Sequence, residues 1–104
     1  MNDKYILDEA GNPIPELDAL RWAEWFEKAG NKRQVAKTEQ GGVLVSTVFL
    51  GLNHRFGDGP PLLYETMIFG GDNDDYQTRC CTRAEALEEH RKACALVRPQ
   101  EEKP

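Results

Sequence analysis

A histidine and an arginine stand side by side in a stretch rich in glycine and proline, His54-Arg55-Phe56-Gly57-Asp58-Gly59-Pro60-Pro61. An imidazole and a guanidinium in one loop could bind an anion or move a proton. Glu65 follows a few residues later, and a carboxylate with a raised pKa is a candidate general acid or base. His54, Arg55, Asp58 and Glu65 are therefore the first candidate site. The glycines predict turn geometry, because the lysine of a nucleotide-binding loop is missing.

The acidic residues are unevenly distributed along the chain. Between positions 56 and 78 there are five acids and no Lys or Arg, while the other 13 of the 18 acids balance the 13 bases. This segment therefore accounts for the net charge of −5. The five acids are Asp58, Glu65, Asp72, Asp74 and Asp75. Phosphate would be repelled, so we expect no direct nucleic-acid binding; a basic surface on a host protein is the natural partner. We expect the strand and loops that carry these acids to adjoin one another.

Two groups of residues could be taken for metal ligands. His90 and Cys94 would share a helix face, but the adjacent Cys80 and Cys81 would point to opposite faces of a strand. At most three ligands are then available, whereas a structural zinc site takes four. The run from Asp72 to Asp75 alternates oxygen ligands as calcium loops do, without their twelve-residue pattern, and favours an acidic hairpin turn. We predict no metal, no cofactor and reduced thiols in a cytosol.

Two helices are predicted from the hydrophobic periodicity. In residues 15–30, started by Pro15 or Asp18, the side chains of Trp22, Trp25 and Phe26 fall on one face, which predicts core packing rather than base stacking. A second helix, ending at about residue 97, opens with the capping-box pattern Thr82-Arg83-Ala84-Glu85. Its predicted inner face contains Ala84, Leu87, Cys94 and Val97.

Four strands are predicted between the helices, at residues 33–40, 43–52, 62–69 and 76–82. Gly41-Gly42 predicts a tight hairpin between the first two. Residues 53–61 form a loop and residues 70–75 a polar turn. Glu65 is either solvated on an open face or, if the helices cover its side of the sheet, pushed toward the core.

These elements predict one α+β domain over residues 1–104. We expect a two-layer fold with a four-stranded antiparallel sheet and both helices on one face. Residues 1–14 form an arm or a fifth short strand, and residues 98–104 a frayed tail. The composition, 39% hydrophobic and 30% charged, is typical of a globular chain. Neither a membrane span nor a signal peptide is visible.

The sequence "VSTVFLGLNHRFGDGPPLLYETMIFGG", preceded by "KYILDEAGNPIPELDALRWAEWFEKAG", resembles small open reading frames found in bacteriophage and prophage genomes. The resemblance covers most of residues 4–71. Its recurring features are Thr47-Val48-Phe49-Leu50-Gly51, His54, Phe56, Gly59-Pro60-Pro61, Glu65-Thr66-Met67 and Phe69-Gly70-Gly71. No activity is established for this family, so the resemblance implies no catalytic residue. It implies a compact accessory protein acting in the bacterial cytoplasm.

The functional hypothesis is a phage-type accessory protein, more readily a binder than an enzyme, that binds a host macromolecule stoichiometrically. Counter-defence is one purpose for such binding. The alternative is a small-ligand-binding protein or hydrolase that uses the His54/Arg55 loop and Glu65, and a structural virion component comes third. The sequence leaves a homodimer open.

Overall fold

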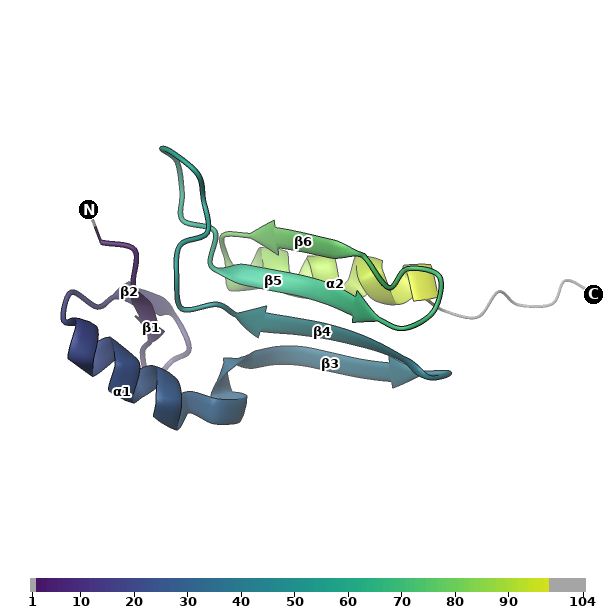
Figure 1. Ribbon diagram of the computed structural model, residues 1–104, viewed down its shortest axis with the longest axis horizontal. Helices are drawn as coiled ribbons and strands as arrows, with labels where there is room; N and C mark the ends of the chain where they lie inside the picture. Colours follow the sequence, from purple (N-terminus) through teal and green to yellow (C-terminus); the bar gives the residue numbers. More distant parts are fainter. Residues whose placement is uncertain (1, 98–104) are drawn as a thin grey trace, which may run out of the picture.

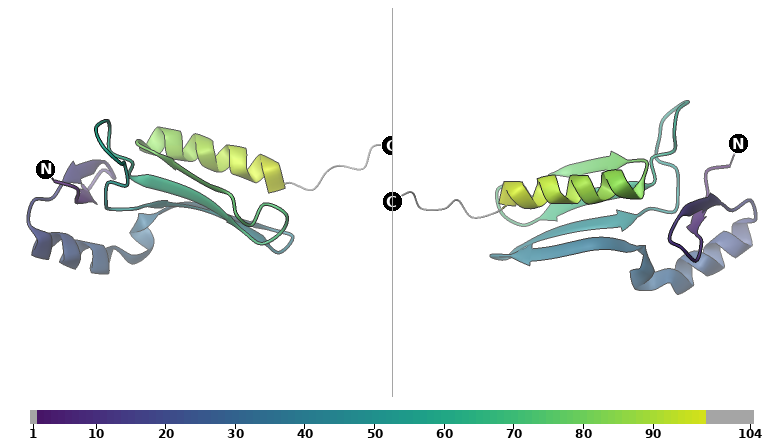
Figure 2. Two further views of the ribbon diagram at one scale, coloured as in Figure 1. Left: turned by 45° about the horizontal axis from the view of Figure 1, so that its top comes forward. Right: turned by 180° about the vertical axis from the view of Figure 1, so that it is seen from behind.

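The computed structural model describes residues 2–97, and its main feature is a four-stranded antiparallel sheet (Figure 1). The strands are β3 (Gln34–Gln40), β4 (Val43–Phe49), β5 (Tyr64–Phe69) and β6 (Gln77–Cys80), in the spatial order β3-β4-β5-β6. Helix α2 (Arg83–Val97) lies across one face of this sheet (Figure 2). The predicted α+β class and the four-stranded antiparallel sheet are confirmed. The predicted tail at 98–104 lies outside the described residues.

The N-terminal elements form a separate group at one end of the sheet (Figure 1). Strand β1 (Tyr5–Leu7) pairs with β2 (Pro13–Pro15) in a hairpin, which is followed by α1 (Ala19–Ala29) and the 3-10 turn η1 (Gly30–Arg33). The expected extra strand therefore exists, but it pairs within its own two-stranded sheet. Helix α1 begins at residue 19 because Pro15 belongs to β2 and because the Asp18 side chain accepts hydrogen bonds from the first backbone amides of the helix.

Helix α1 lies at the end of the four-stranded sheet, whereas α2 lies across its face (Figure 1). Helix α1 packs against β1 and the chain just after β4. The indole N–H of Trp22 donates to the carbonyls of Tyr5 (3.1 Å) and Gly51 (2.9 Å). Gly51 has a φ of +76°, and a Cβ there would lie 3.1 Å from the Phe26 ring, so only glycine lets the helix approach. The apolar face of α1 thus packs on the hairpin and on the end of the sheet, where the Trp25 ring meets the Phe49 ring edge-on with 5.9 Å between their centroids.

The inner face of α2 agrees with the prediction at Cys94 and Val97, which pack against the core, and differs at Ala84 and Leu87, which are exposed. Ala86, His90 and Ala93 are buried, whereas Leu87 is 44% exposed. The sheet presents large side chains under the helix, so small residues face it and allow close packing.

The capping box at the start of α2 is confirmed, because the Thr82 hydroxyl accepts from the Glu85 amide and the Glu85 carboxylate accepts from the amide of Thr82, both at 3.1 Å.

Two apolar clusters lie between α2 and the sheet. One contains Phe49, Leu63, Tyr64 and Ala86, and the other contains Val45, Ile68 and Ala93. Between them lies a buried polar layer around His90. Its Nδ1 lies 2.8 Å from the Thr47 hydroxyl and its Nε2 lies 2.9 Å from the Thr38 hydroxyl. The Thr47 and Thr66 hydroxyls are 2.7 Å apart.

The polar layer suits a neutral imidazole. One ring nitrogen of neutral histidine donates and the other accepts, and a threonine hydroxyl can do either. Burial lowers the pKa of His90 below its usual value of 6.5. The layer thus joins β3, β4 and β5 to α2 through one uncharged ring.

Replacing Thr47 with Val should lower the free energy of unfolding by ~1–3 kcal/mol, because it leaves a nitrogen of His90 and the Thr66 hydroxyl without this partner. Thr78→Val is the matched control. The Thr78 hydroxyl is buried without a hydrogen-bond partner in the described part of the chain, so its removal should leave stability unchanged or higher. Urea unfolding measures both variants. Equal losses in the two would contradict the hydrogen-bonded layer.

Stability should also fall on mild acidification, as the pH drops below about 6.5, the ordinary histidine pKa. The folded-state pKa of His90 is below the unfolded value, so the unfolded chain binds the proton more readily and acid favours unfolding. The stabilisation is fully present above about pH 6.5 and is lost as the pH falls through the lowered pKa. NMR titration should place the His90 midpoint below 6.5, and a midpoint above that value would refute the burial argument. His54→Gln, at an exposed position, should leave this pH dependence of stability intact.

Candidate functional site

Residues 53–62, here called the projecting loop, extend from the end of the sheet between β4 and β5 (Figure 1). Asn53 closes the base of this loop. Its side-chain oxygen accepts from the amides of Arg55 (2.8 Å) and Leu62 (3.0 Å), and the His54 amide donates to the Leu62 carbonyl at 3.0 Å. Because these bonds join the two ends of the loop to each other, its base is closed.

The Arg55 side chain folds back across the same loop. Its Nε donates to the Pro60 carbonyl, and its Nη2 lies 3.7 Å from the Cys81 sulfur. Gly59 has a φ of +129°, and a Cβ there would lie 2.9 Å from Arg55 Cδ. The backbone conformation therefore favours glycine, and the missing side chain leaves room for the arginine stem. The guanidinium braces the loop, so the structure gives it a positioning role.

The tip of the projecting loop carries Phe56 and Asp58. Phe56 is fully exposed, and Asp58 is exposed beside it. Full burial of a Phe side chain contributes about 1.5–3 kcal/mol, and none of this contributes to the fold when the ring stays in water. Sequence reasoning did not select Phe56 as a site residue. The sequence pattern that could have identified it is an aromatic residue among glycines and prolines, because a side chain in such a loop has no core to pack against.

Glu65 lies away from this tip, on the face of the sheet that α2 leaves open. Its carboxylate accepts from Arg79 Nε at 3.0 Å and from Gln77 Nε2 at 2.5 Å, both on β6. Glu65 thus lies on the open face, as one alternative expected, but its side chain is only 13% exposed and is held by these two partners rather than solvated. Among the described residues its carboxylate contacts neither His54 nor Arg55. The geometry does not assemble these three residues into one ligand-binding or hydrolytic site.

The acids of residues 56–78 form two separate groups. Asp58 is in the projecting loop, whereas Asp72, Asp74 and Asp75 lie in the turn at the other end of β5 (Figure 1). The Asp74 carboxylate accepts from the Gly70 amide at 2.5 Å and so shapes this turn. A six-residue strand is about 20 Å long, more than twice the screening length of about 8 Å. The three aspartates of the turn therefore adjoin one another as expected, whereas Asp58 lies too far away to add its field to theirs.

The cysteines and His90 have structural surroundings. Burial, together with the nearby carboxylates of Glu85 and Glu89, raises the pKa of Cys80 to about 11. Its thiol is therefore a poor nucleophile at neutral pH, because the thiolate is the reactive form. Both ring nitrogens of His90 contact threonine hydroxyls. His90 is thus a core residue that sequence reasoning treated only as a possible metal ligand.

Comparison of the chain with protein-family models, with curated proteins and with solved structures finds no match in any of the three. Neither helix in the described part of the chain is long and apolar enough to cross a membrane.

Replacing Asn53 with Ala should loosen the projecting loop. The amides of Arg55 and Leu62 both lose their acceptor, so their hydrogen exchange should accelerate by about tenfold or more, for a local loss of ~1–2 kcal/mol. Asn53→Asp keeps an acceptor oxygen at this position and is the matched control, which should exchange close to the wild-type rate. Unchanged protection of both amides in Asn53→Ala would show that Asn53 does not hold the loop.

Proposed function

We propose that this protein is a non-catalytic binding protein that uses the projecting loop to recognise a partner protein stoichiometrically. The observation that carries the proposal is Phe56, a fully exposed aromatic ring at the tip of a loop whose base is fixed by Asn53 and Arg55. Aromatic side chains in preorganised positions supply much of the binding energy in protein interfaces. The bracing of the loop lowers the ordering cost of binding.

The expected partner has an apolar pocket for Phe56 and a basic group at the rim of that pocket. Asp58, two residues further on, is exposed and supplies the complementary charge. Arg55 has its guanidinium turned back onto the loop, so Asp58 is the charge that the tip presents. A host protein with a basic surface in the bacterial cytoplasm fits this description, in keeping with the phage-type resemblance. Counter-defence is one purpose that such binding would serve.

Phe56→Ala should abolish capture of the partner from a bacterial lysate while leaving the fold intact. Truncation of an aromatic anchor costs about 2 kcal/mol or more, or roughly 30-fold in affinity, and Phe56 makes no core contact that its loss would remove. Leu20→Ala is the control, because Leu20 is also apolar and largely exposed but lies on α1. The affinity of each variant for the purified captured protein is then measured by calorimetry.

The two variants separate the outcomes clearly. Partners lost with Phe56→Ala and retained with Leu20→Ala support recognition by the loop. Capture of the same partners by Phe56→Ala at wild-type affinity would overturn the proposal. Asp58→Asn should mainly slow association, and the difference from wild type should shrink as salt is added.

A further inference from the structure

Strand β3 lies at one edge of the main sheet, and in the described part of the chain it pairs only with β4 (Figure 1). Strand β6 forms the other edge, but it has four residues where β3 has seven. An edge strand carries backbone N–H and C=O groups that another strand can bind. The outer side of β3 is therefore a candidate interaction surface.

The turn after β3 determines which of its backbone groups face outward. Gly41 and Gly42 join β3 to β4 with φ values of +59° and +82°, as a type I′ turn requires. The residues that flank such a turn, Gln40 and Val43, form a hydrogen-bonded pair. Hydrogen-bonded and non-hydrogen-bonded pairs then alternate along the two strands. The N–H and C=O groups of every second residue of β3 therefore point away from β4.

Lys37 and Glu39 are the residues whose backbone groups point outward, because they alternate with Gln40 and Thr38. The Thr38 hydroxyl contacts His90 of α2, so the side chains of its two neighbours lie on the face that α2 leaves open. The Lys37 and Glu39 side chains are 55% and 72% exposed. The edge thus presents a base and an acid two residues apart, each with an outward backbone donor and acceptor.

We propose that β3 pairs with β3 of a second copy of this chain, antiparallel and with Thr38 on the two-fold axis. An outward residue must lie opposite an outward residue, so a central overlap puts the axis at position 37, 38 or 39. An axis at 37 sets lysine against lysine, and an axis at 39 sets glutamate against glutamate. An axis at 38 sets Lys37 opposite Glu39 twice, with matching charges. The charges of the edge therefore select both the second copy and the register.

The two four-stranded sheets join into one continuous sheet in this arrangement. Each Lys37–Glu39 pair exchanges two backbone hydrogen bonds, so the contact contains about four, beside two exposed ion pairs. An edge contact of this size buries less area than a standard interface, and its dissociation constant is on the order of 0.1–1 mM. The inference goes beyond the proposed function, because the contact uses no residue of the projecting loop.

Sedimentation analysis of the full chain at about 0.1–1 mM measures the association. Lys37→Glu and Glu39→Lys each set like charges opposite one another at both pairs, so each variant should associate roughly tenfold or more weakly than wild type. Lys92→Glu is the control matched to Lys37→Glu, because it reverses the same charge at an exposed residue of α2 beside β6. This control should associate like wild type. A wild-type chain that stays monomeric at about 1 mM overturns the proposal.

Mixing the two charge variants provides the sharper test. In a one-to-one complex of Lys37→Glu with Glu39→Lys, both cross-strand pairs again join opposite charges, so the mixture should form a dimer. A double variant with both substitutions in one chain should self-associate like wild type for the same reason. Single variants that associate like wild type, or a mixture and a double variant that stay monomeric, overturn the proposal.

Hydrogen exchange locates the contact. The amides of Lys37 and Glu39 should become protected as the protein concentration rises, whereas the Thr38 amide, which faces β4, should be protected throughout. Protection of the two outward amides only in a complex with a captured lysate protein would assign the edge to a strand of another protein and overturn self-pairing.

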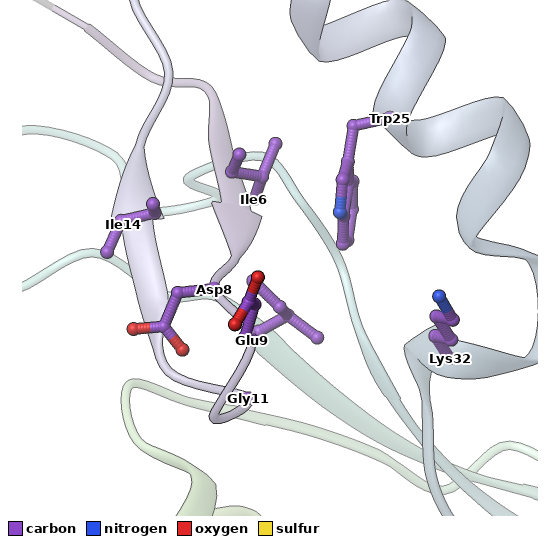
Figure 3. Close-up of a pocket in the computed structure, with 8 residues that line it drawn as sticks. Ile6, Asp8, Glu9, Gly11, Ile14, Trp25 and Lys32 are labelled. Atoms are coloured by element: carbon purple, nitrogen blue, oxygen red, sulfur yellow. The ribbon is translucent and has the colours of Figure 1, made fainter.

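A cavity of about 650 Å³ between the N-terminal hairpin and α1, here called the Trp25 cavity, provides a control surface (Figure 3). Ile14 lines it from the hairpin and Trp25 from α1, and its charged residues, Asp8, Glu9 and Lys32, have both signs. Ile14→Asp, at a residue that is 39% exposed, should associate like wild type, with its fold checked by circular dichroism. Loss of association in this folded variant would place the contact at the cavity and refute pairing through β3.

Phe56→Ala separates this inference from the proposed function. The variant should self-associate like wild type while losing the captured lysate protein. Loss of its self-association would refute pairing through β3. Retention of both self-association and capture would leave β3 pairing standing and refute the proposed function of the loop.

Discussion

Helix α2 is joined to the sheet through one buried imidazole, and much of the structure depends on that contact. His90 lies between two apolar clusters and contacts the hydroxyls of Thr38 on β3 and Thr47 on β4. A polar ring in this position is tolerated only while its nitrogens are satisfied, because an unpaired buried polar group costs more than its hydrogen bond contributes. The hydroxyls on the strands therefore fix where along the sheet the helix can sit. Ala86 and Ala93, one helical turn or so to either side, are small enough to let the backbone of α2 approach.

At the other end of the sheet, the chain just after β4 contacts both α1 and the N-terminal hairpin and then leads into the projecting loop. The Gly51 carbonyl accepts from both the Tyr5 amide and the Trp22 indole. Two residues later Asn53 closes the base of the loop. A short segment of backbone thus positions the Trp25 cavity on one side and the Phe56 ring on the other. The proposed binding element therefore lies at the periphery of the molecule, while His90 and the Cys80 side chain pack in or against the core.

The separation of charges along β5 changes how the acidic segment is understood. In the sequence the acids look like one field, whereas in three dimensions a strand of about 20 Å divides them. Glu65 is neutralised locally by Arg79, and Asp74 is used by its own turn. Asp58 is an exposed charge two residues from Phe56, which is fully exposed. Recognition by Phe56 and Asp58 together requires a partner surface that is complementary in shape to the loop. It depends less on long-range electrostatic attraction, which salt screens.

The sequence by itself determined the two helices, the four strands of the main sheet and their order, since periodicity, the Gly41-Gly42 turn and the capping box at Thr82 are local signals that depend on a few neighbouring residues. It also determined that the stretch around His54 is a loop, because its glycines and prolines cannot continue a strand. Tertiary structure alone decided that α1 lies beside the sheet, that His90 is core and that Arg55 braces the loop while Glu65 faces elsewhere. Each of these depends on contacts between residues far apart in the chain, such as Trp22 with Gly51 and His90 with Thr38. A helical pattern indicates that a face is buried, but the surface that buries it is chosen by packing of the whole molecule.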